Sequence, residues 1–153
     1  MEFTSIAQLE AYLQRQIQET LKDDVEKEVK KVMKHAIATN VYAKYTPRGY
    51  QRRFDSSRKG AFGLLAEQNM KGEYHMEGNH MILSVRNKAR GDERADQLDQ
   101  VIESGEGYDW FHSSGKRLFP RPFYQPTRDM LARTRGHVTA MKNGLRKRGI
   151  EVY

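Results

Sequence analysis

A long apolar stripe near the start of the chain constrains the fold more than any other feature. Apolar residues recur there at steps of three and four, as they do along one face of an amphipathic helix, and they are Ile6, Leu9, Leu13, Ile17, Leu21, Val25, Val29, Val32 and Ala36. Ser5 and Gln8 form a capping box before the stripe, and no Gly or Pro occurs ahead of Pro47. We therefore expect a helix over about residues 5–43.

A helix of this length is too long for a compact chain of 153 residues. At 1.5 Å per residue it would exceed about 50 Å, whereas a compact domain of this size has a radius of gyration of about 15 Å. The helix must either project and need a partner or break, and Asp23-Asp24 is the favoured break point. A coiled coil is disfavoured because the stripe steps mostly by four.

The rest of the chain reads as loops, a small sheet and a second helix. Turn residues and arginines indicate an Arg-rich loop over 44–60. A sheet is expected over about 61–104, with strands at Phe62–Met70, Glu73–Met76 and Asn79–Arg86, and with residues 97–103 ambiguous between helix and strand. Three prolines between Pro120 and Pro126 exclude a helix there, so residues 105–126 are expected as a Pro/aromatic loop.

The C-terminal part is predicted as one helix and one short strand. Thr127 is a suitable N-cap, and Gly149 is a suitable C-cap, which gives a helix over about 127–148 and a strand at 150–152. The sequence as a whole predicts a single domain, 1–153, of the α+β class. Its long N-terminal helix and its C-terminal helix would pack on a small, mainly antiparallel sheet.

Composition narrows the setting in which such a chain works. It contains no Cys, so disulfides and thiolate metal sites are excluded. The first residues lack the basic start and apolar stretch of a signal peptide, and the apolar runs are too short to span a bilayer. We expect a soluble protein made in the cytoplasm, with no membrane contact.

The net charge of +7 is distributed in blocks of opposite sign. Residues 41–60 are basic, with six Lys/Arg and one Asp/Glu, and residues 111–153 are also basic, with ten Lys/Arg and two Asp/Glu. Between them, residues 92–110 are acidic, with one Lys/Arg and seven Asp/Glu. Basic blocks bind nucleic acid, and blocks of opposite sign also hold identical subunits head to tail in a ring.

The sequence contains no convincing pattern of catalytic residues. The histidines lack metal-ligand spacing, and no nucleophile motif or phosphate-binding loop is present. A magnesium-dependent nuclease is the weaker alternative, using the acidic run Asp92, Glu93, Asp96, Asp99 and Glu103. We expect no enzyme activity, no cofactor and no metal.

The Arg-rich loop has two interpretations. Its aromatic and basic residues suit stacking and phosphate contacts on nucleic acid. They also suit the docking of a loop on another subunit, and we favour this second interpretation. The candidate DNA-facing or acidic-partner-facing residues are Arg48, Arg52, Arg53, Arg58 and Lys59. We expect this loop to order only on assembly.

Three segments together resemble a known phage family. Ile102-Glu103-Ser104-Gly105 is soon followed by Trp110-Phe111-His112, and Pro120 to Thr127 runs as Pro-Arg-Pro-Phe-Tyr-Gln-Pro-Thr into a helix. The long first helix leads to an Arg-rich loop and then to strands. This order resembles the minor head-tail component family of siphophages, also described as head–tail joining, neck or tail-completion proteins. The Tyr45–Arg53 stretch is similar to the version in phages of Gram-positive hosts.

The resemblance implies a virion protein that works by assembly in the host cytoplasm. Its partners would be other phage head-connector and tail proteins, and its copies would form a ring at the connector/tail interface, with non-specific contact to phage DNA. In that family the glutamate-glycine turn follows a strand. The candidate subunit or partner interface residues are Tyr45, Tyr50, Phe54, Trp110, Phe111, Arg121, Pro122 and Phe123. A DNA-binding protein using the Lys44–Lys59 loop and the C-terminal helix is the alternative.

Overall fold

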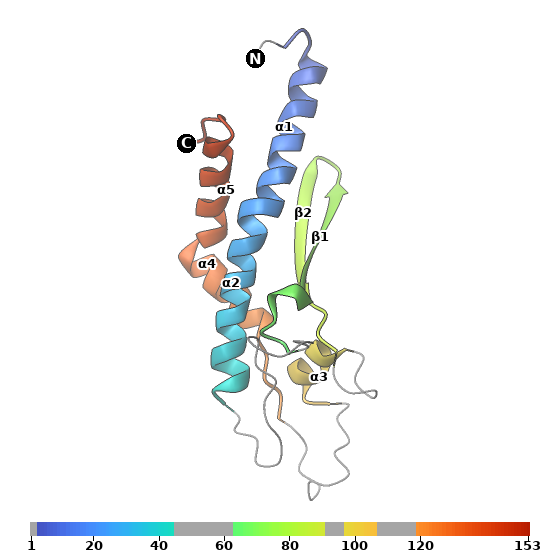
Figure 1. Cartoon of the computed structure of the whole chain (residues 1–153), viewed down its shortest axis with the longest axis vertical. Helices are drawn as coiled ribbons and strands as arrows, with labels where there is room; N and C mark the ends of the chain where they lie inside the picture. The colour runs from blue at the N-terminus through green and yellow to red at the C-terminus, as the bar shows by residue number, and fades with distance from the viewer. Residues whose placement is uncertain (1–2, 45–62, 91–96, 107–118) are drawn as a thin grey trace, which may run out of the picture.

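The computed structural model describes residues 3–44, 63–90, 97–106 and 119–153. Its longest element is one continuous helical rod, which consists of α1 (Ile6–Thr20), η1 (Leu21–Val25), α2 (Glu26–Ile37) and η2 (Ala38–Tyr42). Figure 1 shows that the upper part of α1 extends past the other elements. The predicted helix is confirmed, and it projects rather than breaks.

The two η segments in this rod are π-helical turns. The Glu26 N–H donates to the Leu21 carbonyl, and the Ala43 N–H donates to the Ala38 carbonyl, both at a spacing of five residues. In an α-helix each step of four residues overshoots a full turn by about 40°. A wider turn takes up part of that drift, so the expected break near Asp23-Asp24 is a widened turn instead.

The start of the helix follows the sequence prediction. Ser5 is the N-cap, and its hydroxyl oxygen accepts a hydrogen bond of 3.3 Å from the Gln8 N–H. The Gln8 side chain reaches back and accepts from the Thr4 N–H at 3.1 Å. These contacts satisfy backbone donors that the first turn leaves without partners.

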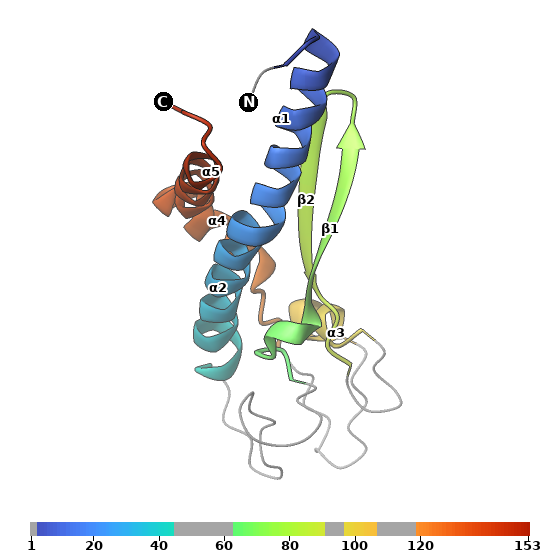
Figure 2. The ribbon, with the colours of Figure 1, turned by 45° about the horizontal axis from the view of Figure 1, so that its top comes forward.

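A two-stranded antiparallel hairpin stands beside the rod (Figure 2). Its strands are β1 (Met70–Glu77) and β2 (His80–Asn87), and Gly78, with φ 59°, forms the predicted turn. The predicted strand at Phe62–Met70 is wrong where it is described. Residues 63–69 form turns and the 3-10 helix η3 (Glu67–Asn69), because the Asn69 side chain donates to the Gly63 carbonyl and competes with strand pairing.

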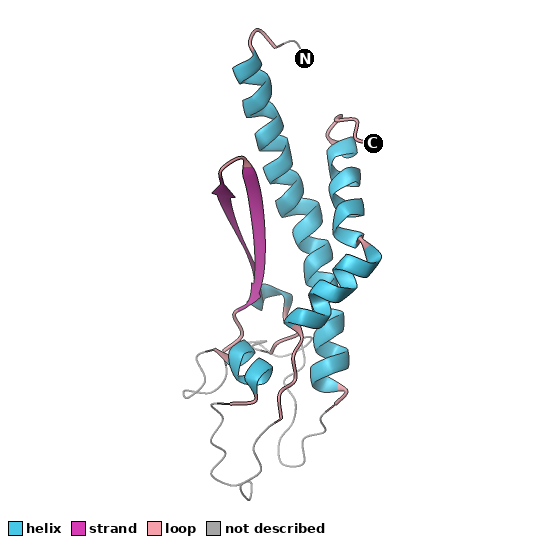
Figure 3. Cartoon of the chain, turned by 180° about the vertical axis from the view of Figure 1, so that it is seen from behind, coloured by secondary structure: helices cyan, strands magenta, loops and turns pink. Residues whose placement is uncertain are grey.

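The C-terminal part forms two helices, not the one predicted. They are α4 (Tyr124–Thr134) and α5 (Gly136–Lys147), separated by Arg135, whose φ of 52° is left-handed. In Figure 3, α4 crosses the rod obliquely and α5 then runs alongside it. Residues 150–152 form no strand, and Gly149, with φ 79°, follows the end of α5 as expected for a C-terminal cap.

The hydrophobic core lies at one end of the rod. It is built from α2, η2, the base of the hairpin, α3 (Leu98–Ser104) and the start of α4, and its members are Met33, Ala36, Ile37, Val41, Leu64, Met70, Ala89, Ile102 and Phe123. The architecture is α+β, as predicted, but the helices pack mainly on each other. The hairpin contacts the rod through its base and through one polar link described below.

Substitution of Gly144 tests how closely α5 approaches the rod. A Cβ atom there would lie 2.5 Å from Thr20 Cγ2 and 2.6 Å from Asp24 Oδ2. Helix propensity alone would make Gly144→Ala stabilising by about 0.5–1 kcal/mol, but overpacking costs about 1–3 kcal/mol, so we expect net destabilisation in urea unfolding. The exposed neighbour provides the control, since Asn143→Ala should change the free energy of unfolding by less than about 0.5 kcal/mol. A stabilised Gly144→Ala protein would contradict the close packing.

Candidate functional site: a motif, a polar knot and an exposed arm

Two residues of the Pro-Arg-Pro-Phe motif, Arg121 and Phe123, are buried. Phe123 is 0% exposed and belongs to the core, and Arg121 is 6% exposed with its guanidinium 5.9 Å from the centre of the Phe119 ring. Pro122 is exposed. The sequence predicts all three residues at an interface with a partner. The structure instead places the Phe123 side chain where no partner reaches it without opening the core.

A glutamate from another element caps α4. Glu103 Oε1 accepts hydrogen bonds of 2.7 Å from both the Phe123 and the Tyr124 N–H groups. A carboxylate at a helix N-terminus satisfies free donors and interacts favourably with the helix dipole. The predicted N-cap, Thr127, is therefore wrong: it lies buried within α4, where its hydroxyl donates to the Phe123 carbonyl at 2.6 Å. Pro126 is accommodated in the first turn, where its missing N–H costs nothing.

Tyr124 joins this cap to the hairpin. Its hydroxyl donates to Asp99 Oδ2 at 2.8 Å and accepts from the Asn87 N–H at 2.9 Å. The buried Asn87 side chain in turn donates to the Leu64 carbonyl at 2.7 Å. Burial, followed by the hydrogen bond to Asp99, raises the pKa of Tyr124 well above its ordinary value, so the phenol stays protonated and keeps donating.

This network assigns structural work to two members of the acidic run. Asp99 holds Tyr124 and Glu103 caps α4, while Asp92, Glu93 and Asp96 lie outside the described residues. Among the residues that the structure describes, no group of three or more His, Asp or Glu side chains is arranged to hold a metal ion. The family expectation of a strand before Glu103 is also corrected, because Glu103 lies in the last turn of helix α3, which ends at Ser104 and is followed by Gly105 with φ 71°.

Most predicted surface residues lie outside the described part of the chain. These are the interface candidates Tyr45, Tyr50, Phe54, Trp110 and Phe111 and the basic candidates Arg48, Arg52, Arg53, Arg58 and Lys59. Their roles stay predictions. The segments that carry them begin and end on the core, since Val41 and Leu64 flank one of them and Ile102 and Phe123 flank another.

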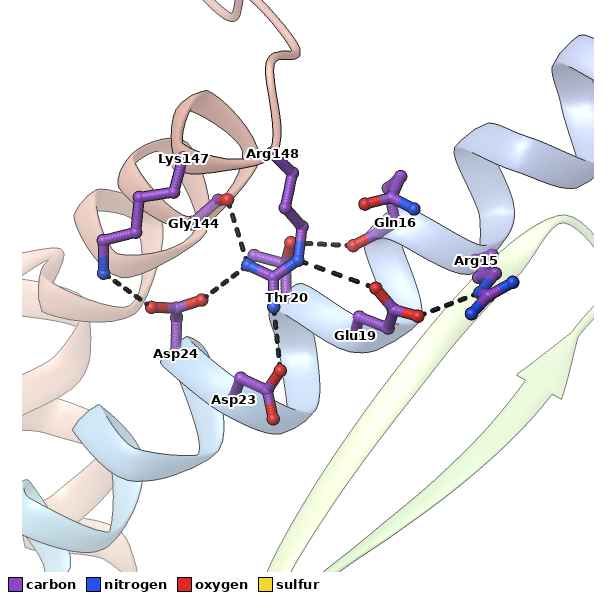
Figure 4. Close-up of polar contacts among 9 residues, drawn as sticks. All are labelled: Arg15, Gln16, Glu19, Thr20, Asp23, Asp24, Gly144, Lys147 and Arg148. Carbon is purple, nitrogen blue, oxygen red and sulfur yellow. Dashed lines mark hydrogen bonds and ion pairs between the residues drawn. The ribbon is translucent and has the colours of Figure 1, made fainter.

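A polar knot fixes α5 to the π-helical turn of the rod (Figure 4). The Arg148 guanidinium donates to Asp23 Oδ2 at 2.8 Å, to Asp24 Oδ2 at 2.9 Å and to the Gly144 carbonyl at 3.1 Å. Its Nε also lies 3.9 Å from Glu19, and Lys147 Nζ lies 3.0 Å from Asp24 Oδ1. Although burial raises the pKa of Asp24, the hydrogen bonds from Lys147 and Arg148 lower it overall.

A second polar link holds the hairpin against the rod. The Tyr74 hydroxyl donates to Glu26, which also lies 2.7 Å from Lys30 Nζ. Burial tends to raise the pKa of Glu26, but the bonds from Lys30 and Tyr74 lower it overall. Gly72 faces this carboxylate on the strand, and a Cβ there would push the end of the Glu26 side chain aside.

Toward the free end of the rod the apolar stripe passes from half-buried at Leu13 and Ile17 to exposed at Ile6 and Leu9. Its side chains are covered where α2 meets the core, with Val32 6% and Ala36 0% exposed. At the free end Ile6 is 76% exposed and Leu9 38%, and the Phe3 ring, at 37%, lies 5.3 Å from the Tyr12 ring in a tilted arrangement. We call residues 3–17 the arm. The stripe therefore continues past the elements that bury it.

Comparison with known protein families identifies the family of this chain. The family model YomN matches residues 5–147, which include the arm, the hairpin and both C-terminal helices. The chain belongs to the YomN family. This is a phage-derived family of the Bacillus SPbeta type, so the chain is a bacteriophage protein. Searches of curated proteins and of solved structures return no match, and none of the described helices is long and apolar enough to cross a membrane.

Sequence reasoning missed most of the polar contacts that organise the YomN-family chain. Asp23-Asp24 and Lys147-Arg148 are adjacent pairs of opposite charge in the sequence, but they lie more than 120 residues apart and no local pattern joins them. Glu103 was read as part of an acidic run rather than as a cap for residues twenty positions away. Nothing in the sequence pattern marked Asn87 or Arg135.

Replacement of Arg148 tests the polar knot. Arg148→Met should lower the free energy of unfolding by about 2 kcal/mol near neutral pH, since partly buried hydrogen bonds to charged groups are lost. Because the pKa of Asp24 is lowered by folding, its contribution is present above its ordinary pKa and is lost as pH falls through the lowered value. The stability of the variant should therefore depend less on pH between about pH 5 and pH 2 than that of the unchanged protein.

Arg128→Met is the matched control for this experiment. Arg128 is an exposed arginine of α4 with no carboxylate partner in the described residues. Its replacement makes the same chemical change and should leave both the stability and the pH profile nearly unaltered. An equal effect of the two substitutions would mean that the knot adds nothing beyond net charge.

Proposed function

We propose that this protein is a structural component of a tailed-phage virion that acts in head–tail joining or tail completion, as copies in a ring at the connector/tail interface. Its membership of a phage-derived family supports the setting. The order of sequence segments, which resembles that of head–tail joining proteins, supports a location at the joint between head and tail. Neither assigns it an enzymatic role, and the exposed arm supports a role in assembly.

The exposed stripe of the arm is the observation that carries the proposal. A monomeric protein gains nothing from extending an amphipathic helix beyond its core, because a short isolated helix is marginally stable in water. Exposed apolar patches of this kind mark protein–protein contacts. Ile6 and Leu9 belong to the same apolar stripe as Val25 and Val32, which are buried within the chain. A neighbouring subunit would bury the exposed end of the stripe in the same way.

A ring is supported by the position of the arm relative to the core. The arm and the core lie at opposite ends of one rod (Figure 1). A contact between two different surfaces is heterologous, and such a contact repeats from copy to copy, giving a ring where the rotation between copies closes and an open filament where it does not. The proposed contact is therefore between the arm of one copy and the body of the next, or a connector protein in its place.

Electron microscopy of particles that lack this gene tests the function directly. We expect DNA-filled heads beside separate tails, and joined particles once the purified protein is added back. Normal joined particles without the protein would overturn the proposal. Unjoined particles that the added protein fails to cure would also count against action at the joint itself.

Variants of the arm sharpen this test. Ile6→Gln with Leu9→Gln should abolish the joining activity in the add-back assay, while the free energy of unfolding of the isolated protein changes by less than about 0.5 kcal/mol per site, since both side chains are already exposed. Tyr153→Gln is the control, because it also replaces a large exposed side chain by glutamine, at a position outside the arm where the tyrosine is 98% exposed. Full joining by the arm variant would remove the arm from the proposed interface.

A further inference from the structure

The solvent-facing side of α5 has an unusual charge pattern. From Met130 to Ile150 the chain contains no Asp or Glu, yet it contains six cations, which are Arg133, Arg135, Lys142, Arg146, Lys147 and Arg148. The polar knot neutralises the last two by pairing them with Asp23 and Asp24. The remaining cations have no such role in the knot.

Three of these remaining cations share one face of the helix. Lys142 follows Arg135 by seven residues and Arg146 follows it by eleven, so at 100° per residue the three positions lie within about 20° of one line. Arg135 and Arg146 are exposed and Lys142 is half-buried. No carboxylate in the described parts of the chain forms an ion pair with any of them, and Arg146 donates only to the backbone carbonyl of Val152 at 2.9 Å.

Uncharged donors fill the space between these cations. Thr139 and Asn143 are exposed on the same side of α5, which extends about 16 Å from Arg135 to Arg146 at 1.5 Å per residue. No large apolar side chain of α5 is among the exposed ones that the structure describes. The face therefore offers hydrogen-bond donors and positive charge, without the apolar anchors that protein interfaces use.

Arg135 occupies a position that favours glycine. Its φ of 52° makes it the one non-glycine residue with positive φ in the described chain, and its N–H donates to the Leu131 carbonyl at 2.8 Å as the cap of α4. Glycine adopts this conformation without steric cost and is the usual residue at such a cap. An arginine at this position carries backbone strain that glycine would avoid, and strain of this kind clusters at functional positions.

We propose that this face of α5, formed by Arg135, Thr139, Lys142, Asn143 and Arg146, binds the phosphate backbone of duplex DNA. Arg, Lys, Thr and Asn side chains are the groups that contact phosphates, and such contacts carry no sequence information. The binding is therefore independent of base sequence. It goes beyond the proposed joining function, because it requires no ring and no particular place in the particle.

The affinity of the full-length protein for a short labelled duplex, measured over a series of salt concentrations, tests the proposal. A face variant combines Arg135→Gly, Lys142→Gln and Arg146→Gln. A control variant combines Lys22→Gln, Lys27→Gln and Lys71→Gln, which are exposed lysines on other surfaces. Both variants remove three positive charges, so net charge alone affects them equally.

We expect the face variant to weaken binding about tenfold or more and to flatten the slope of log affinity against log salt by about 2.7, at 0.9 per lost phosphate contact. The control variant should keep the slope of the unchanged protein. Equal losses in the two variants would overturn the proposal, and so would the absence of DNA binding by the unchanged protein. Polyglutamate serves as a second probe, and binding to it as tight as to DNA would indicate an acidic protein partner instead.

Arg135→Gly alone separates a binding role from a structural one. Glycine adopts the same left-handed conformation without steric strain, so the midpoint of thermal unfolding should rise. The affinity for DNA should fall, because the guanidinium is lost. A structural role alone would not move these two quantities in opposite directions. A raised midpoint with unchanged affinity would overturn the part assigned to Arg135. DNA affinity and particle joining are measured in separate assays, so failure of this proposal and failure of the joining function are distinguishable outcomes.

Discussion

The length of the first helix is the constraint on which the rest of this structure depends. At 1.5 Å per residue the rod from Ile6 to Tyr42 is about 55 Å long, which is more than the remaining chain can cover. The core forms at one end of the rod, where η2 and α2 meet α3 and the start of α4, while the hairpin and α5 run along its middle part (Figure 1). The other end keeps its amphipathic pattern without its own cover. A folded body and an exposed arm are thus two consequences of one helix.

The π-helical turn η1 is where the rod is attached to its neighbours. The turn lies between Thr20, which is 0% exposed beneath Gly144, and Glu26, which holds the hairpin through Tyr74. Asp23 and Asp24 leave the same turn toward Arg148. An apolar stripe that steps by four would drift around a regular α-helix, and the wider turn reduces that drift. One local change of geometry thus keeps the stripe aligned and presents carboxylates to two different elements.

The sequence predicted those parts of the fold that local patterns determine. The Ser5 cap, the apolar stripe and the turn at Gly78 depend on residues a few positions apart, and all three are confirmed. The start of α4 was wrong because its cap, Glu103, comes from a separate helix, so Thr127 seemed the better choice. The break at Arg135 was missed because glycine, not arginine, is the residue that marks a left-handed turn. Phe123 was assigned to a surface because the pattern around prolines does not reveal which side chains the core receives.

The fold keeps its apolar and its cationic surfaces apart, and this separation has a physical reason. Copies of a chain with a net charge of +7 repel each other, and the repulsion is strongest where unpaired cations face one another. The arm carries only Glu10 and Arg15 as charged residues among residues 3–17, so an apolar contact there brings little like charge together. The cations of the knot are neutralised internally by Asp23 and Asp24, which leaves the outer face of α5 as the charged surface. In a ring of the proposed kind, a polyanion bound to that face would neutralise the repulsion between neighbouring copies, so DNA contact and assembly would support each other without sharing a residue.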